Sequence, residues 1–276
     1  MRALDVVKNK EIVKIYPTTT IREALKIMNE NRFRRLPIVY PNNKLVGIIT
    51  AMDIVDFIGG GSKYNLIREK FNRNFVAAIN QPVREIMTKE VITLDENDDI
   101  DMAIETFLNK NVGGVPILDK EGHFLSLITE RDVIKALINK IDENETIEDY
   151  ITRKIIYATP GERLKDVART MVRNGFRRLP VVSEDKLVGI ITATDFIKLL
   201  GSNWTFKKME MGNVREITNV RIEEIMIKDV ITANNNDKLK DVAKIMVEKD
   251  IGALPVVEDS KLIGIITEKD VIKYFT

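Results

Sequence analysis

The side chains best suited to chemistry in this 276-residue chain are threonines, each followed three residues later by an aspartate. This Thr-x-x-Asp pattern occurs four times, each time where an apolar run ends. The pairs are Thr50 and Asp53, Thr129 and Asp132, Thr192 and Asp195, and Thr267 and Asp270. An ionised aspartate has four lone-pair sites, so one carboxylate can accept hydrogen bonds from both hydroxyls of a ribose. The threonine and the helix N-terminus that follows would then lie near a phosphate.

The same pattern also suits a structural role. A threonine at a helix N-cap, with an acidic residue at the third helical position, is close to a capping box, which stabilises a helix by about 1 kcal/mol. A cap alone would accept serine, asparagine or aspartate first and glutamate or glutamine last, yet all four copies keep threonine and aspartate. We therefore expect ribose binding at two or more of these sites, with helix capping as the alternative.

The four pairs belong to four internal repeats. Each repeat reads apolar-Pro-apolar-apolar and then, after a short gap, an apolar run that ends in Thr-x-x-Asp. The prolines are Pro37, Pro116, Pro180 and Pro255, and the aspartates follow 16, 16, 15 and 15 residues later. Repeats one and three share the octapeptide KLVGIITA (44–51 and 186–193), whereas repeats two and four share EIM-x-K-[ED]-VIT (85–93 and 224–232). The order is therefore ABAB, which indicates a duplicated pair.

The repeat has the pattern of alternating strands and helices. Ile21, Ala24, Leu25 and Met28 follow the spacing of an amphipathic helix, and the apolar runs 36–39 and 45–50 indicate two strands joined by a turn. A second helix is expected after the aspartate. The resulting β-α-β-β-α unit of about 55 residues is too small to cover both faces of its own sheet, so the repeats should pack in pairs.

This unit, closed by Gly, an apolar residue and then [IL]-Thr-x-x-Asp, resembles the cystathionine-β-synthase (CBS) domain, and two units resemble a Bateman module. Four units in one chain are similar to the gamma subunit of AMP-activated protein kinase and its stand-alone archaeal relatives. The resemblance implies an α/β fold in which two Bateman modules pack as a disk. The predicted repeats span residues 5–58, 82–140, 146–200 and 221–276. The family binds AMP, ADP, ATP, S-adenosylmethionine or no detectable ligand.

The resemblance also assigns candidate phosphate ligands. In the gamma subunits, residues just before the proline include phosphate ligands, which here are Arg34 and Arg35 in repeat one and Arg177 and Arg178 in repeat three. Guanidinium groups form charge-assisted, often bidentate bonds to phosphate. The alternative is a charged strand edge that deters aggregation.

Repeats two and four have small residues before the proline and carry their basic residue elsewhere. Arg131 and Lys269 stand directly before the aspartates, where one repeat of the gamma subunit has a phosphate-binding lysine. The alternative for these two is surface charge.

Composition excludes several classes of site. The chain has no cysteine and one histidine, His123, so cysteine-ligated zinc and histidine clusters are excluded and we expect no metal site. Lys plus Arg (43) nearly equals Asp plus Glu (42), which makes a nucleic-acid partner the least expected. No apolar run approaches the ~18 residues needed to cross a membrane, and no signal peptide precedes the first repeat. We expect a cytoplasmic protein. His123 reads as a solvated loop residue, and Trp204 and Phe206 as packing anchors.

The sequence therefore predicts a regulatory or energy-sensing protein, not an enzyme, that binds AMP, ADP or ATP between paired repeats and needs no further cofactor. The alternatives are a binder of S-adenosylmethionine or methylthioadenosine and a ligand-free interaction scaffold. A protein that responds to this regulation is a possible partner. A monomer is preferred, because four repeats can complete the disk, and a homodimer is the alternative.

Overall fold

Each repeat contains a helix, a β-hairpin and a second helix in the computed structural model, which describes residues 1–202 and 212–276. Repeat 1 contains α2 (Ile21–Glu30), β1 (Arg35–Val39), β2 (Leu45–Thr50) and α3 (Ala51–Val55). Repeat 2 contains β3 (Leu94–Asp95), α5 (Ile100–Lys110), β4 (Gly114–Leu118), β5 (Phe124–Thr129) and α6 (Glu130–Leu137). Repeat 3 contains α7 (Leu164–Asn174), β6 (Arg178–Ser183), β7 (Lys186–Thr192) and α8 (Ala193–Gly201). Repeat 4 contains α11 (Leu239–Glu248), β8 (Ala253–Glu258), β9 (Lys261–Thr267) and α12 (Glu268–Ile272).

The predicted β-α-β-β-α order is confirmed, although the first strand is short. In repeat 2 it is β3, and in each of the other repeats it is a single parallel bridge, such as Ile15 with Ile38. Only two hydrogen bonds hold this bridge, from Ile15 N to Pro37 O at 3.0 Å and from Val39 N to Ile15 O at 2.9 Å. The chain then turns away into the first helix.

The sequence pattern accounts for the packing of these elements. Ile21, Ala24, Leu25 and Met28 are the buried residues of α2, and the same spacing buries one face of α5, α7 and α11. The four prolines occupy one register in the hairpins, where Pro37 stands opposite Ile48. Proline has no N–H to donate, and its carbonyl accepts from the short first strand, as Pro37 O does from Ile15 N.

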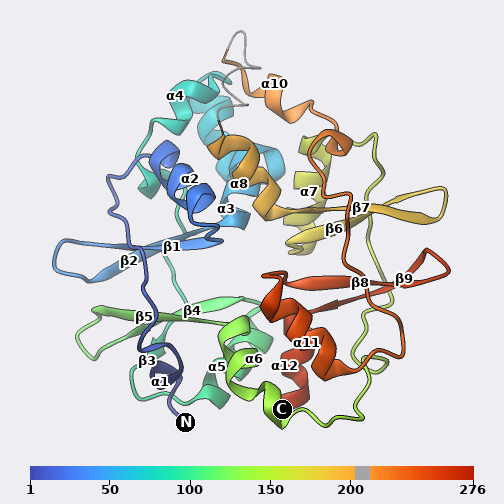
Figure 1. Ribbon diagram of the computed structural model, residues 1–276. Helices are drawn as coiled ribbons and strands as arrows, with labels where there is room; N and C mark the ends of the chain where they lie inside the picture. Colours follow the sequence, from blue (N-terminus) through green and yellow to red (C-terminus); the bar gives the residue numbers. More distant parts are fainter. Residues whose placement is uncertain (203–211) are drawn as a thin grey trace.

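The four repeats lie around a common centre (Figure 1). One apolar core joins the helices of repeats 1 and 3, and a second joins those of repeats 2 and 4. Repeats 1 and 2 meet at their hairpins through the small cluster Val39, Ile48, Phe124 and Leu127. Repeats 3 and 4 meet where β7 pairs with β9 at Lys186 and Lys261. Each repeat therefore has one neighbour across its helices and another across its hairpin.

Shorter elements connect the repeats. They are α1 (Ala3–Val7), α4 (Phe75–Ile79), α10 (Val214–Thr218) and the single-turn segments η1 (Asp56–Gly60), η2 (Ser62–Tyr64), η3 (Leu66–Lys70), η4 (Val83–Glu85), η5 (Ile138–Lys140), η6 (Ile222–Glu224) and η7 (Lys273–Phe275). The predicted packing residues Trp204 and Phe206 lie outside the described residues. In the described ranges, every helix is too short or too polar to cross a bilayer.

Candidate functional site

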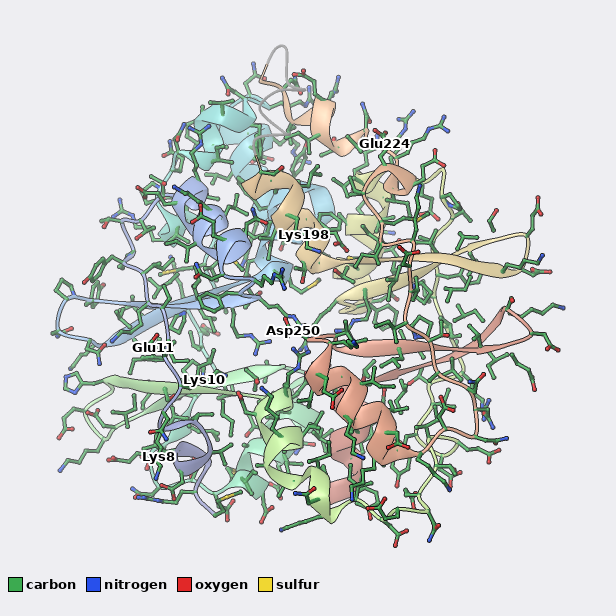
Figure 2. The ribbon with its side chains drawn as sticks, in the orientation of Figure 1. Lys8, Lys10, Glu11, Lys198, Glu224 and Asp250 are labelled. Carbon is green, nitrogen blue, oxygen red and sulfur yellow. The ribbon has the colours of Figure 1, made fainter. Side chains whose placement is uncertain are left out.

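A cavity of about 1120 Å³ occupies the centre, and residues of all four repeats line it. It extends between paired repeats into clefts, which we number by the repeat that contributes the Thr-x-x-Asp pair. The facing wall comes from the paired repeat: Thr88 bridges Ile48 in cleft 1, Ile227 bridges Ile190 in cleft 3, and Thr152 bridges Ile265 in cleft 4. In cleft 2 the wall is the segment before α2, from which Lys10 reaches Leu127 O at 3.3 Å. Lys10 and Glu11 of this segment are labelled in Figure 2.

All four Thr-x-x-Asp pairs form a capping box. In repeat 2, Asp132 Oδ2 accepts from Thr129 N at 2.9 Å and from Thr129 Oγ1 at 2.6 Å, and Thr129 Oγ1 accepts from Asp132 N at 3.3 Å. The other three pairs have the same arrangement. The capping role is therefore confirmed and uses mainly Oδ2 of each carboxylate. Ribose binding at these aspartates stays a prediction.

Each of these aspartates also contacts a lysine. Lys198 and Lys273 lie three residues after Asp195 and Asp270, at 3.4 and 2.7 Å from Oδ1. Asp132 instead contacts Lys10, whose Nζ lies 2.6 Å from Oδ2. A cation therefore lies at every carboxylate predicted to accept ribose hydroxyls.

In cleft 1 two side chains contact the same oxygen of the aspartate. Its lysine, Lys63, comes from the connection after repeat 1 and forms an ion pair with Asp53 Oδ1, which also accepts from Thr88 Oγ1 at 3.0 Å. The Asp53 side chain is 8% exposed. Two glycines shape the turn that brings Lys63 back to the cleft, because Gly59 has φ 140° and a Cβ on Gly60 would lie 2.5 Å from Val172 Cγ2. Lys63 was missed in the sequence, since it lies outside the repeat motif.

Two of the five predicted phosphate-binding arginines have no carboxylate partner among the described residues. Arg35 donates to Gly113 O at 2.5 Å and Arg178 to Gly252 O at 2.7 Å. Burial, reinforced by the Arg177 guanidinium, lowers the pKa of Arg35 to about 10. Burial, reinforced by Arg34, does the same for Arg178, whose pKa is also about 10. Both groups remain cationic at neutral pH in surroundings that disfavour the cation.

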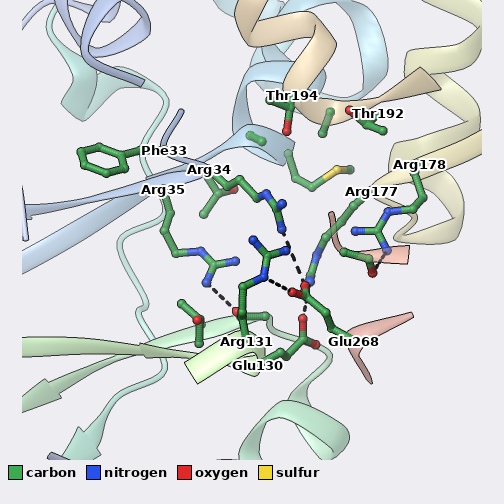
Figure 3. A pocket seen from close by; sticks show the side chains of 18 of the residues that line it. Phe33, Arg34, Arg35, Glu130, Arg131, Arg177, Arg178, Thr192, Thr194 and Glu268 are labelled. Carbon is green, nitrogen blue, oxygen red and sulfur yellow. Dashed lines mark hydrogen bonds and ion pairs between the residues drawn. The ribbon is translucent and has the colours of Figure 1, made fainter. Parts of the chain in front are cut away.

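The other arginines meet two buried glutamates (Figure 3). Arg177 Nη1 lies 3.2 Å from Glu130 Oε2, and Arg34 Nη1 lies 3.6 Å from Glu268 Oε2. Arg131 donates from Nε to Glu268 Oε1 at 2.6 Å. The pairs of Arg34 with Glu268 and of Arg177 with Glu130 join diagonally opposite repeats, 1 with 4 and 2 with 3. The pair of Arg131 with Glu268 joins the neighbouring repeats 2 and 4.

Arg131 has donor capacity to spare. Its Nη1 contacts Asp250, but its buried Nη2 has no hydrogen-bond partner. Burial lowers the pKa of this guanidinium, and the Glu268 carboxylate opposes that shift. A buried, unpaired guanidinium nitrogen facing other cations is typical of an anion site.

Lys269, which occupies the position of Arg131 in repeat 4, does not line the cavity. Its Nζ donates to Leu108 O at 3.0 Å and to Asn111 Oδ1 at 3.2 Å. Its predicted role as a phosphate ligand would require it to leave these partners.

A set of apolar residues was missed in the sequence. In every repeat the residue after the proline pairs with a residue of the short first strand. The apolar residue lies two positions before that partner, and the four are Val13, Ile92, Ile156 and Ile231. Three of them are 38–40% exposed, and Val13, Ile92 and Ile231 line the cavity. The signal was the recurring segment that ends in two apolar residues, KEIV, KEVI, RKII and KDVI. These side chains offer an apolar surface for a flat ring in each cleft.

The cavity brings together most, but not all, of the predicted site residues. Those that line it are Arg34, Arg35, Thr50, Asp53, Thr129, Arg131, Asp132, Arg177, Arg178 and Thr192. Those that do not are Asp195, Thr267, Lys269 and Asp270. Clefts 1 and 2 therefore open to the centre with both motif residues, cleft 3 with its threonine, and cleft 4 with neither.

One cluster of potential metal ligands lies away from the cavity. Asp119, Glu121 and His123 gather in the turn between β4 and β5. Asp119 accepts there from the backbone N–H of both other residues and lies 2.9 Å from His123 Nδ1. These bonds within the turn account for the cluster, and the His123 side chain is 35% exposed.

Comparison with known proteins supports the repeat architecture. The model of the CBS domain matches residues 4–60, 83–139, 147–202 and 222–276. An uncharacterized protein of Methanocaldococcus jannaschii, MJ1225, is 72% identical over 100% of this chain and 99% of its own length. Its crystal structure, described as that of a candidate archaeal homolog of g-AMPK, covers 100% of both chains with a TM-score of 0.97. An uncharacterized Pyrococcus horikoshii protein matches 100% of both chains at 25% identity and a TM-score of 0.62.

Proposed function

Because the chain belongs to the CBS-domain family, with four CBS repeats, we propose that it is a regulatory protein that binds adenine nucleotides, with their phosphates in the central cavity. The excess of cations at that centre carries the proposal. Five arginines face two buried carboxylates, of Glu130 and Glu268, and the exposed carboxylate of Asp250 there. Arg35 and Arg178 donate to carbonyls alone, and Arg131 keeps an unpaired buried nitrogen. A phosphate would satisfy donors that the protein leaves free.

The clefts supply the other two parts of a nucleotide site. Val13, Ile92 and Ile231, which line the cavity, offer apolar surfaces for adenine. The aspartate at the neighbouring helix N-terminus offers acceptors for ribose hydroxyls. The lysine at each aspartate would have to move when ribose binds. Lys198 and Lys273, with side chains 57% and 49% exposed, can do so most readily.

Regulation would arise at the centre. Ligand phosphates and the buried glutamates compete for the arginines that join opposite repeats, so bound nucleotide would change how the two halves of the disk hold together. A protein partner would read that change if it binds the two arrangements with different affinity. Four repeats enclose the cavity within one chain, which supports a monomeric binding unit.

The test is calorimetric titration with AMP, ADP, ATP and S-adenosylmethionine of protein that has been unfolded and refolded to remove any bound ligand. Binding of AMP with more than one equivalent per chain, weakened by Asp132→Ala, is the expected result. Heat from S-adenosylmethionine alone, unchanged in Arg177→Ala, would favour a binder of S-adenosylmethionine or methylthioadenosine. No heat from any ligand would favour a scaffold.

A further inference from the structure

We propose that Glu130 and Glu268 are specificity-determining residues: they limit the phosphate charge that the central cavity accepts, so nucleoside monophosphates bind more tightly than di- and triphosphates. The inference rests on the proposed function and deepens it. It begins from an exchange of residues between the two kinds of repeat. Repeats 1 and 3 have two arginines before the proline, and an alanine follows the threonine of the motif. At the same positions repeats 2 and 4 have two small residues and a glutamate.

The small residues make room for the exchange. A Cβ on Gly113 would lie 2.8 Å from Glu130 Oε2 and closer still to the Arg177 guanidinium. A Cβ on Gly252 would lie 2.8 Å from Glu268 Oε2 and 2.7 Å from Arg178 Nη2. Any side chain at these two positions would therefore collide with the buried carboxylates and with the arginines beside them.

The glutamates are held in place. Glu130 and Glu268 are 4% and 5% exposed, and each is the first residue of a helix, α6 or α12, where the helix dipole favours a negative charge. The backbone N–H of Glu268 donates to Gly252 O at 3.1 Å. A carboxylate fixed in this way stays close to any ligand that enters the centre.

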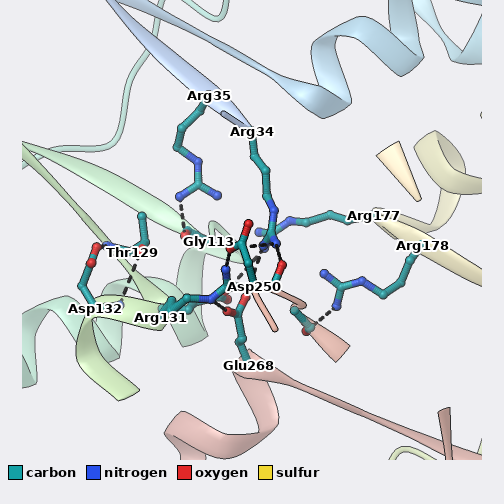
Figure 4. A network of polar contacts seen from close by, with 12 residues as sticks. Arg34, Arg35, Gly113, Thr129, Arg131, Asp132, Arg177, Arg178, Asp250 and Glu268 are labelled. Carbon is teal, nitrogen blue, oxygen red and sulfur yellow. Dashed lines mark hydrogen bonds and ion pairs between the residues drawn. The ribbon is translucent and has the colours of Figure 1, made fainter. Parts of the chain in front are cut away.

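The arginines consequently fall into two groups. Arg35 and Arg178 lie on opposite sides of Glu268 (Figure 4). Both bind only carbonyl oxygens, so each can take one phosphate without displacing a carboxylate. Arg34, Arg131 and Arg177 are already paired with Glu130 or Glu268. The α-phosphate would bind the first group, and a longer chain would bring further charge toward the two glutamates.

The electrostatic consequence is a charge limit. Protein sites are described well by an effective dielectric constant of about 20. At that value the interaction energy of two unit charges roughly 10 Å apart is somewhat larger than the free energy of a tenfold change in affinity. Each phosphate beyond the first meets this repulsion, and the arginines that would attract it, Arg34, Arg131 and Arg177, are already balanced by Glu130, Glu268 and Asp250. A further phosphate therefore finds no net attraction there while it loses hydration, so binding weakens. Magnesium, which neutralises the β- and γ-phosphates, should relieve the penalty.

The experiment measures the affinities of AMP, ADP and ATP without divalent cations, and of ATP with saturating Mg²⁺. Wild-type protein should bind in the order AMP, ADP, ATP, and Mg²⁺ should tighten ATP binding. Glu268→Gln and Glu130→Gln keep the side-chain shape and an acceptor oxygen. Each should tighten Mg-free ATP binding about tenfold and change AMP binding much less. The control, Glu248→Gln, removes the same charge from the exposed face of α11 and should change neither.

The outcomes separate the two proposals. If wild-type protein binds Mg-free ATP as tightly as AMP, the charge limit is overturned while nucleotide binding stands, and this result needs no variant to fold. If the glutamine variants fold and shift AMP and ATP affinity by the same factor, the glutamates are structural braces only. If no adenine nucleotide binds the wild-type chain, the proposed function fails and this inference fails with it.

Discussion

Replacing Arg35 with methionine should stabilise the ligand-free protein while weakening nucleotide binding. Its pKa of about 10 lies below the 12.5 of a free guanidinium, so folding disfavours the cation. The cost applies in full at every pH below about 10, including neutral pH, and disappears only as the pH rises toward 12.5. At 1.36 kcal/mol per unit, the shift corresponds to at most about 3 kcal/mol, and less because the side chain keeps some contact with solvent.

The substitution also removes a favourable contact. The hydrogen bond from Arg35 to Gly113 O involves a charged donor, and such bonds contribute about 1.5–3 kcal/mol. Methionine keeps an unbranched apolar side chain of similar reach. The two effects nearly offset one another, and we expect Arg35→Met to raise the free energy of unfolding of the ligand-free protein by up to about 1 kcal/mol. Loss of one charged bond to phosphate should weaken AMP binding about tenfold or more.

Urea unfolding of refolded, ligand-free protein and titration with AMP measure the two effects. Arg178→Met tests the same environment in the other half of the chain, and Arg173→Met, on the exposed face of α7, is the control. A loss of 2 kcal/mol or more in Arg35→Met, with AMP affinity unchanged, would show that the arginine is a structural residue. The reasoning from its missing carboxylate partner would then be refuted.

Three further changes test other parts of the site. Lys63→Ala should raise the number of AMP equivalents bound per chain in calorimetry, because it frees Asp53 Oδ1 in cleft 1. Thr129→Ala should lower the free energy of unfolding by about 1 kcal/mol in urea, since one oxygen of the capping box is lost. Gly60→Ala should destabilise the protein by about 1–3 kcal/mol in the same assay, because its Cβ would lie 3.0 Å from two carbonyl oxygens and closer to Val172.

Each has a control. Lys198→Ala removes the mostly exposed lysine of cleft 3 and should change the AMP stoichiometry less than Lys63→Ala. Unchanged stoichiometry in Lys63→Ala would show that Lys63 does not obstruct its cleft. Gly161→Ala, where a Cβ would meet nothing within 4 Å, should leave stability almost unchanged. If Gly60→Ala and Gly161→Ala lowered the free energy of unfolding equally, the account of the turn at Gly59 and Gly60 would be contradicted.

Local chemistry made much of this fold predictable. The apolar spacing of Ile21, Ala24, Leu25 and Met28 located α2, and the runs 36–39 and 45–50 coincide with β1 and β2 to within one residue. The spacing of Thr50 and Asp53 predicted a helix N-terminus, which is where α3 begins. These features depend on residues close together in the chain.

Contacts across the chain were beyond such reasoning. Lys63 and Lys10 reach their aspartates from connecting segments whose path is set by packing, so no local pattern identified them. Arg131 and Lys269 hold equivalent positions, but only the branched guanidinium reaches from its helix to a glutamate of the neighbouring repeat. The sequence shows that two repeats have paired arginines and the other two have glutamate. That these residues form ion pairs could be recognised only once it was known which repeats lie diagonally across the centre.

The diagonal pairs have a consequence for how the duplicated chain came to hold together. Arg34 of the first half meets Glu268 of the second, and Arg177 of the second half meets Glu130 of the first. Each half thus carries both partners of the pair, and two copies of either half, related by a twofold axis, could form the same contacts. The fused chain has kept the self-complementary interface of a homodimer, with a covalent link in place of a second molecule.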